Sequence, residues 1–375
     1  MSGKKRLKLK KPILVLLKVL GAICIVVLLC CGIFFFQVNE LKKLGYSSKA
    51  SKNILFSLKK DYVLSVGENK TLNAAFESSY YRDKYLDNYA KIKYQKQENI
   101  IKNINKLLDK GYSNSNISMI LEHGDDAEVS EFAQRDKIKY LEEFYSVDYA
   151  KLSNYDRYLK YSDETGEDEE TTVLYVNLDM DKEDYTDFVD INKFSIDMLV
   201  NKHRKLDSDF VPNDLVEIDE KYTSEEGMKA NKEAINAFIQ MFKAATKEDL
   251  GLVINSSYRS YSDQEEICES YRELYGNSYV ERYVAQPGFS EHQTGLAFDI
   301  GSTSSRIFAD SKEYEWLQDN AYKYGFILRF SKKYEDITGF RNEPWHYRYV
   351  GKKIAKYIYE HNITLEEYYV TFLDK

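Results

Sequence analysis

The sequence predicts an α+β protein, in which one apolar helix and a helical region precede a small antiparallel sheet flanked by helices. Three observations support this prediction. Residues 19–36 form an uncharged run, apolar residues recur at helical spacing between residues 39 and 160, and short β-branched and aromatic segments alternate with helical patterns after residue 172. At 375 residues and 43% hydrophobic content, the chain is long enough for more than one domain.

The N-terminus has the pattern of a membrane anchor. Residues 1–12 contain six basic residues and no acid, and the apolar stretch 13–38 that follows carries a single charge, on Lys18. A stretch of roughly 17 to 25 apolar residues can cross a bilayer as a helix. A cleaved signal peptide would need small residues before its cut site, whereas three phenylalanines follow the apolar core here. We expect an uncleaved, single-pass transmembrane helix, with residues 1–12 in the cytoplasm and the C-terminal domain extracellular.

Charge and cysteine content narrow the possible partners. Subtracting the six basic residues of the tail from the formal net charge of −8 leaves −14 for the rest of the chain. An acidic exterior argues against a nucleic-acid partner, because phosphate contacts need clustered Lys and Arg. Three of the four cysteines lie in the apolar run. Cys268 therefore has no partner for an intramolecular disulfide, and we expect it to be a small buried residue on a helix.

Residues 39–171 are predicted to form a helical extracellular region with an internal repeat. Gly45, Tyr46 and Ser47 recur in the same register as a Gly-Tyr-Ser triplet at residues 111–113, and a weaker third copy is predicted to open at residues 145–146. Glycine is favoured just after a helix and serine just before one, so each triplet predicts a helix–turn–helix unit. The acidic run at 163–170 is typical of a solvated loop.

The C-terminal domain is predicted to span residues 172–375. Residues 172–178 have the β-branched and aromatic composition of a strand, and a helical pattern follows at 228–242. Residues 250–257 read as a buried strand, after which a capping box at Ser262 and Glu265 predicts a helix to about residue 275. Arg259 lies in the turn between this strand and this helix. It could bind a carboxylate or an oxyanion, although an isolated Arg is more typical of a surface ion pair.

The next strand and the turn before it carry two candidate metal ligands, Asp299 and His292. Residues 296–300 alternate so that Leu296, Phe298 and Ile300 share one face and Asp299 lies on the other. A turn that contains Gly295 separates this strand from His292, so both side chains could approach one metal. The spacing of one His and one Asp is weak evidence by itself.

A second short segment, Glu343 to His346, completes the candidate site. The residue before a proline favours extended backbone, so Glu343 and His346 need a turn to face one site. Together with His292 and Asp299, they supply two imidazoles, a carboxylate ligand and a spare carboxylate. A catalytic zinc takes three protein ligands and leaves one position for water, which an unligated carboxylate can deprotonate.

A structural alternative exists for the same segment. Trp345 and Tyr347 could pack in the core while Glu343 pairs with Arg341 or Arg348.

The arrangement of these residues resembles a known family. The pattern Ser290-x-His292-x2-Gly295-x-Ala297-x-Asp299 with Glu343-x2-His346 resembles the signature of the LAS zinc peptidases. The wider context resembles VanY-type D-alanyl-D-alanine carboxypeptidases over about residues 172–375, in the segments 257–260, 286–288, 324–326 and 343–351.

The resemblance implies a zinc-dependent D,D-carboxypeptidase that removes the terminal D-Ala from peptidoglycan stem peptides by attack of a metal-bound water. It implies that zinc is held by His292, Asp299 and His346, with Glu343 as the general base. It also implies that three residues contact the substrate, namely Arg259, Gln286 and Ser290.

Two other functions remain open from the sequence. An L,D-carboxypeptidase that acts on tetrapeptide stems would use the same zinc site. A protein of another class, a non-catalytic cell-wall binding or sensor module, would keep the fold without the chemistry, and the Gly-Tyr-Ser repeats could themselves bind wall polymer.

Overall fold

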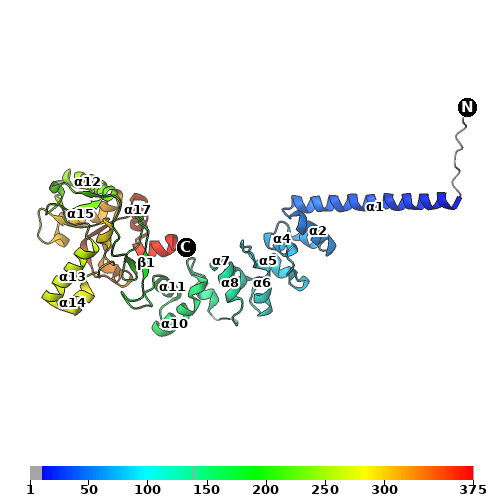
Figure 1. The fold of residues 1–375 in the computed structure, drawn as a ribbon, viewed down its shortest axis with the longest axis horizontal. Coiled ribbons are helices and arrows are strands. Elements are labelled where there is room, and N and C mark those ends of the chain that lie inside the picture. The colour runs from blue at the N-terminus through cyan, green and yellow to red at the C-terminus, as the bar shows by residue number, and fades with distance from the viewer. Residues whose placement is uncertain (1–10, 137, 139, 375) are drawn as a thin grey trace, which may run out of the picture. The chain divides into compact units, whose positions relative to one another are not determined.

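The structure is a computed structural model that describes residues 11–136, 138 and 140–374. Most of the predicted cytoplasmic tail, residues 1–10, lies outside the described residues. The chain divides into two compact units (Figure 1). The first comprises residues 1–146 and 151–153, and the second comprises residues 147–150 and 154–375. The secondary structure confirms the predicted α+β class, because helices surround a small antiparallel sheet in the second unit.

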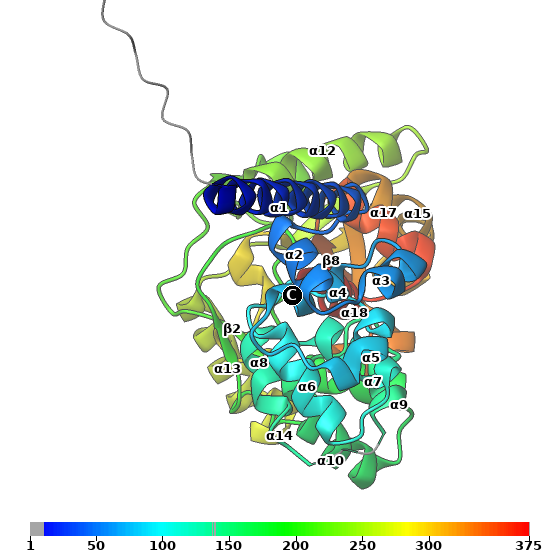
Figure 2. The same cartoon turned by 90° about the vertical axis from the view of Figure 1, so that its right-hand side faces the viewer.

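The apolar N-terminal segment is one long helix, α1 (Lys11–Lys43), which extends beyond the other helices of the first unit (Figure 1). Its segment Val15–Lys43 is long and apolar enough to cross a membrane, and none of its most apolar stretch is buried by the protein. Burial begins only at Val38 and Leu41, where α1 meets α2 (Ser48–Phe56) (Figure 2). The helix thus has the length, composition and exposure of a single-pass membrane anchor.

The rest of the first unit is built from short helices, as the repeat predicts. Gly45 and Gly111 adopt the left-handed backbone, with φ of 99° and 81°. Ser47 and Ser113 then accept hydrogen bonds from the first turns of α2 and α7. Ser146 instead follows α9, so the third copy is not a helix start. The helices after α2 are α3 (Lys60–Val66), α4 (Lys70–Glu77), α5 (Leu86–Lys91), α6 (Ile100–Asp109), α7 (Asn114–His123), α8 (Asp126–Phe132) and α9 (Leu141–Tyr145).

Hydrogen bonds from asparagine side chains join successive helical units. Asn53 Nδ2 donates to Phe76 O at 2.6 Å, and Asn69 Nδ2 donates to Ala90 O at 2.9 Å. Each of these bonds spans a little over twenty residues of sequence, so each unit is tied to the next one along the chain. Repeat proteins are stabilised in this way, mainly by contacts between adjacent units along the chain.

The second unit opens with two helices, α10 (Tyr155–Thr165) and α11 (Glu169–Asn177). The predicted strand at 172–178 is therefore wrong. The Asp168 side chain accepts from Thr171 N at 2.8 Å, and the acids that follow it favour the positive end of a helix. Five of the nine residues of α11 are buried, so the strand-like apolar composition belongs to a helix that is enclosed by the unit. The acidic run that was expected to be a loop thus ends one helix and begins the next.

A four-stranded antiparallel sheet in the order β5-β6-β8-β7 forms the centre of the second unit. Leu296, Phe298 and Ile300 pack in one core with Phe238 and Trp316, which confirms the predicted alternation. The strands are β5 (Leu252–Ser256), β6 (Ala297–Ser302), β7 (Phe326–Phe330) and β8 (Glu343–Tyr349), and the helices that contribute to this core are α12 (Lys232–Thr246) and α15 (Lys312–Asn320).

A second core joins Leu174 of α11 and Ile327 of β7 to two C-terminal helices, α17 (Lys352–His361) and α18 (Leu365–Tyr368). Two small sheets complete the unit. In the first, β1 (Val189–Ile191) pairs with β2 (Arg204–Leu206) in parallel, and in the second, β3 (Leu215–Glu217) pairs with β4 (Lys229–Asn231) antiparallel.

The helix after β5, α13 (Tyr261–Tyr275), begins two residues earlier than predicted. Ser260 caps it and Asp263 closes the capping box, in place of Ser262 and Glu265. Cys268 is buried on this helix, as expected. Two short helices, α14 (Asn277–Tyr283) and α16 (Glu335–Thr338), lie in the connections that follow.

Candidate metal centre

A tight 3-10 turn, Glu291–Thr294, places His292 in the interior. Ser290 caps this turn, and Gly295 ends it with a left-handed φ of 68°. His292 Nδ1 lies 2.7 Å from Ser257 O. Because a carbonyl oxygen only accepts, Nδ1 carries the proton and Nε2 presents a lone pair. Among the described residues, His292 Nε2 has no hydrogen-bond partner although it is buried.

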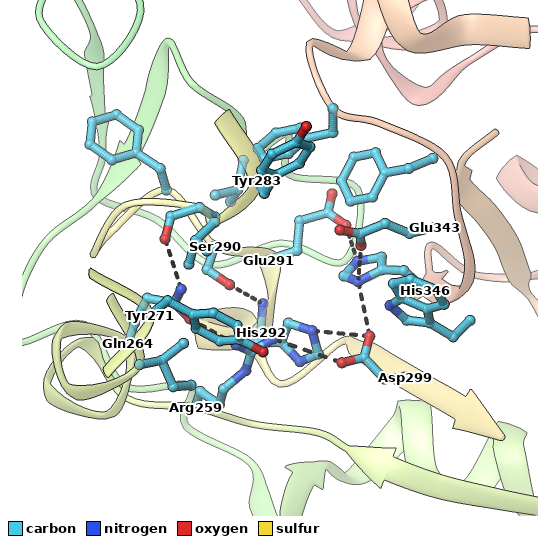
Figure 3. A pocket seen from close by; sticks show the side chains of 18 of the residues that line it. Arg259, Gln264, Tyr271, Tyr283, Ser290, Glu291, His292, Asp299, Glu343 and His346 are labelled. Carbon is cyan, nitrogen blue, oxygen red and sulfur yellow. Dashed lines mark hydrogen bonds and ion pairs between the residues drawn. The ribbon is translucent and has the colours of Figure 1, made fainter. Parts of the chain in front are cut away.

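Asp299 and His346 are brought together by strand pairing. They are directly opposite each other in the register of β6 and β8. Asp299 Oδ1 lies 3.2 Å from His346 Nδ1 and 3.4 Å from His292 Nε2 (Figure 3). The turn at Gly295 therefore does bring His292 and Asp299 to one point.

A bulge in β8 lets Glu343 join His346. Leu328 and Phe330 are two residues apart on β7, yet they pair with Tyr347 and Glu343, which are four residues apart on β8. In a regular strand, residues three apart face opposite sides, and extra residues in one strand re-aim the side chains. Glu343 Oε2 consequently lies 3.7 Å from His346 Nδ1. The turn that the sequence required is supplied by this irregularity.

The alternative interpretation of this segment is only partly realised. Tyr347 is fully buried in the core, but Trp345 is 42% exposed and lines the pocket beside the site. Arg348 pairs with Glu291 instead of Glu343.

One nitrogen or oxygen atom from each of His292, Asp299 and His346 lies within 4.8 Å of the others. Two imidazole nitrogens and one carboxylate oxygen are a donor set that suits zinc. His292 Nε2 and Asp299 Oδ1 are both buried without a hydrogen-bond partner, which is costly in a folded protein unless another group satisfies them. A cation between these atoms would satisfy both, so the residues fit a zinc ion.

The surroundings act in opposite directions on the two histidines of the site. Burial alone would lower the pKa of His346, but the Asp299 and Glu291 carboxylates raise it to about 9, so a metal ion would displace a proton from this imidazole. Burial, together with the nearby Arg259 guanidinium, lowers the pKa of His292 to about 4, which keeps this imidazole neutral.

Burial by itself would raise the pKa of Asp299, but the two histidines hold it well below its usual value, so the carboxylate is ionised. Burial also raises the pKa of Glu343, and the Asp299 charge adds to that effect. Glu343 is thus the carboxyl group of the site that most readily takes up a proton.

Arg259 lies in the turn between β5 and α13, where the sequence placed it. Its Nη1 donates to Gln264 Oε1 at 3.0 Å, and its Nη2 lies 3.9 Å from Asp299 Oδ2. The side chain is 23% exposed, so it is not a surface ion pair. Figure 3 shows the guanidinium beside His292 and Asp299.

A pocket of about 260 Å³ opens onto these residues. Ser290 belongs to its lining, as the sequence suggested. Gln286 does not line this pocket but a separate hollow beside α13, and its main-chain oxygen accepts from Phe289 N at 2.9 Å. Much of the pocket wall is aromatic, and these residues are Tyr271, Tyr279, Tyr283, Phe289, Phe330, Phe340 and Trp345.

Glu291, which directly precedes His292 in the chain, was not predicted from the sequence to belong to the site. Its side chain is buried and its Oε2 lies 3.2 Å from His346 Nε2 (Figure 3). Arg329 and Arg348 both donate to its Oε1. A signal was available, because an arginine within an apolar strand needs a buried acid as a partner. Both arginines stand in such strands, but the sequence does not say which acid they meet.

Comparisons with known proteins agree on the second unit. A family profile described as VanY: D-alanyl-D-alanine carboxypeptidase matches residues 227–352. The putative carboxypeptidase YodJ of Bacillus subtilis (strain 168) is 46% identical over 186 residues, which cover 48% of this chain and 68% of that protein. A D-alanyl-D-alanine carboxypeptidase of Enterococcus faecalis is 39% identical over 145 residues, which cover 36% of this chain and 53% of that protein.

Solved structures give similar matches. The LdcB LD-carboxypeptidase is 44% identical with a TM-score of 0.45, and the match covers 48% of this chain and 94% of that chain. A VanY D,D-pentapeptidase mutant from a VanB-type resistance cassette, in complex with Zn(II), is 33% identical with a TM-score of 0.41, covering 46% of this chain and 97% of that chain.

Proposed function

The chain belongs to the VanY family of D-alanyl-D-alanine carboxypeptidases, and we propose that it removes the terminal D-Ala from peptidoglycan stem peptides as a zinc-dependent D,D-carboxypeptidase. The observation that carries this proposal is the convergence of His292, Asp299 and His346 beside Glu343 in one pocket. All four positions that the chemistry needs hold competent residues.

The metal would be held by His292 Nε2, a carboxylate oxygen of Asp299 and His346 Nδ1. Each atom is already turned toward the other two, so little rearrangement is needed for binding. Zinc, when bound, acts as a Lewis acid that polarises a carbonyl group and makes water more acidic.

Glu343 is proposed as the general base. It stands next to the ligand set without belonging to it, and its side chain is 27% exposed toward the pocket. Its raised pKa suits a group that takes a proton from the attacking water and returns it to the leaving amine.

Arg259 is proposed to bind the substrate at the scissile carbonyl or the terminal carboxylate. Its Nε is buried without a partner among the described residues, and Gln264 fixes the guanidinium from the other side. An arginine held in this way can form two parallel hydrogen bonds to a carboxylate. Ser290 is retained as a second substrate contact because it lines the pocket, whereas Gln286 is assigned only support of the loop through its main chain.

The aromatic wall of the pocket is proposed to bind the stem peptide upstream of the scissile bond. Tyr271, Tyr279 and Tyr283 line the pocket and pack ring against ring, and such rings provide a large contact area with few rotatable bonds.

We also propose how the chain is oriented across the membrane, which the presence of one apolar helix does not determine. Residues 1–12 are basic, which favours a cytoplasmic N-terminus and an extracellular second unit. The exposed Phe56 ring lies 5.5 Å from Phe34 of α1, so the end of α2 lies beside the last part of the apolar stretch. Residues 39–171 would then space the catalytic domain, 172–375, from the anchor. Protease digestion of intact protoplasts tests this, because it should remove the second unit and leave the N-terminal tail protected.

The activity is tested by incubating the purified protein with pentapeptide and tetrapeptide muropeptides and identifying the released product by mass. Release of D-Ala from the pentapeptide alone supports the proposal. Release from the tetrapeptide alone would identify an L,D-carboxypeptidase, and binding without release from either would indicate a non-catalytic wall-binding module.

A further inference from the structure

Four charged side chains form a buried network behind the candidate metal centre. Glu291 and Arg329 are each 3% exposed, and Arg348 and Glu366 are fully buried. Two acids and two arginines balance in charge. None of the four belongs to the proposed ligand set or to the proposed base.

The two carboxylate oxygens of Glu291 have different partners. Oε1 accepts from Arg329 Nε at 2.8 Å and from Arg348 Nη1 at 3.0 Å. Oε2 contacts His346 Nε2 at 3.2 Å. Because two guanidinium groups hold Oε1, the direction of Oε2 toward His346 is fixed.

This contact determines which nitrogen of His346 faces the metal site. An ionised carboxylate only accepts hydrogen bonds, so His346 Nε2 must donate its proton to Glu291. Nδ1, which lies 3.2 Å from Asp299 Oδ1, is then the nitrogen that presents a lone pair to a metal. We infer that Glu291 is a positioning residue that sets the tautomer and ring orientation of His346. This inference rests on the metal site of the proposed function.

The network extends this positioning to the C-terminal end of the chain. Arg329 binds Glu366 through two parallel hydrogen bonds, of 2.9 and 2.5 Å. Glu366 stands in α18, whose start is fixed by a capping box of Thr364 and Glu367. Arg348 is held separately, because its Nη2 donates to Met198 O at 2.8 Å. Glu366 does not contact His346 and therefore acts on it indirectly, through Arg329 and then Glu291.

Stability alone does not account for four buried charges. Removing ions from water is costly, and replacement of a buried ion network by apolar residues is often neutral or stabilising. An apolar group in place of Glu291 could not accept the proton of His346 Nε2. Partners that hold the second nitrogen of a ligating histidine fix its tautomer and typically change metal affinity 10- to 100-fold.

The test is the zinc affinity of Glu291→Gln, measured by chelator competition on the metal-free protein, together with the absorption spectrum of bound Co²⁺. The amide oxygen of the substituted side chain is expected to face the two arginines. Its NH₂ group then points at His346, which must accept at Nε2 and carry its proton on Nδ1. We expect zinc binding to weaken about 10- to 100-fold and the Co²⁺ spectrum to change.

Glu313→Gln is the matched control. Glu313 is also a buried acid of the second unit, but it accepts from Gly251 N and Ser304 Oγ and has no contact with the ligands. A purely structural role for Glu291 would lower the melting temperature of both variants and leave zinc affinity unchanged in both. Unchanged zinc affinity in Glu291→Gln, in a wild-type background that binds zinc, overturns the inference.

If Glu291→Gln does not fold, Glu366→Gln tests instead whether the buried network positions His346 for zinc binding. It weakens the anchor of Arg329 without touching His346, and we expect a smaller loss of zinc affinity, about 10-fold, at the lower end of the range expected for Glu291→Gln. An unchanged affinity would overturn the inference. A wild-type protein that binds no zinc would instead refute the proposed function itself, so the two failures are distinguishable.

Discussion

Glu343→Gln separates the proposed base from the proposed ligands. The substitution keeps the size of the side chain and removes its ability to accept a proton from water. Glu343 Oε2 lies 3.7 Å from His346 Nδ1 and is not among the three converging ligand atoms. Zinc content should therefore stay near that of the wild type. Loss of a general base typically costs about 100- to 10,000-fold in kcat, which is about 2.7 to 5.4 kcal/mol of activation free energy.

The assay is release of D-Ala from a pentapeptide at saturating zinc, with zinc content measured on the same sample. We expect kcat to fall and KM to change little, because Glu343 acts on the reacting water rather than on the bound peptide. Turnover within tenfold of the wild type would show that another group is the base. Loss of zinc together with activity would show that Glu343 is a ligand.

Three further predictions concern Arg259, Gly295 and Asp184. Arg259→Lys should lower kcat/KM about 100- to 1,000-fold, because an ammonium group cannot form two parallel hydrogen bonds; near-normal kinetics would remove Arg259 from the substrate site. Gly295→Ala should lower the free energy of unfolding by about 1 to 2 kcal/mol or more, because the backbone there is left-handed and a Cβ would lie 3.0 Å from a main-chain atom. Gly166 has a similar φ but open space around it, so Gly166→Ala should lose less stability in thermal unfolding. The hydrogen bond from His203 is the main cause that lowers the pKa of Asp184 to about 2. The ionised Asp184 therefore stabilises the folded protein above about pH 4, and this stabilisation is lost as the pH falls toward 2. The difference in melting temperature between the wild type and Asp184→Asn should shrink over that interval, and a constant difference would contradict the assignment.

The ligands were predictable because short local patterns carry them. His292 and Asp299 are separated by one glycine turn and the start of a strand, and both can be read from the sequence. The alternation of Leu296 and Phe298 correctly gave the buried face of that strand. Residues this close in sequence are constrained by local backbone geometry, which sequence patterns describe well.

The features that were predicted wrongly or missed depend on contacts between distant parts of the chain. Residues 172–178 have strand composition, but the cap at Asp168 and the packing of Val173 and Val176 favour a helix, so local propensity was overridden. The bulge that lets Glu343 join His346 depends on pairing with β7, which no local pattern reveals.

The positioning network was beyond sequence reasoning for the same reason. Glu291, Arg329 and Glu366 are separated by 38 and 37 residues of sequence, and only the folded chain brings them into contact. An arginine in an apolar strand predicts a buried acid, but the chain contains 61 acidic residues from which to choose.

The most direct test of the central claim is the zinc content of the purified full-length protein and of His346→Ala. The account predicts one zinc per chain in the wild type and a content well below one in the variant, because two ligands without His346 Nδ1 do not make a stable zinc site. A wild-type content well below one that the substitution leaves unchanged would contradict it.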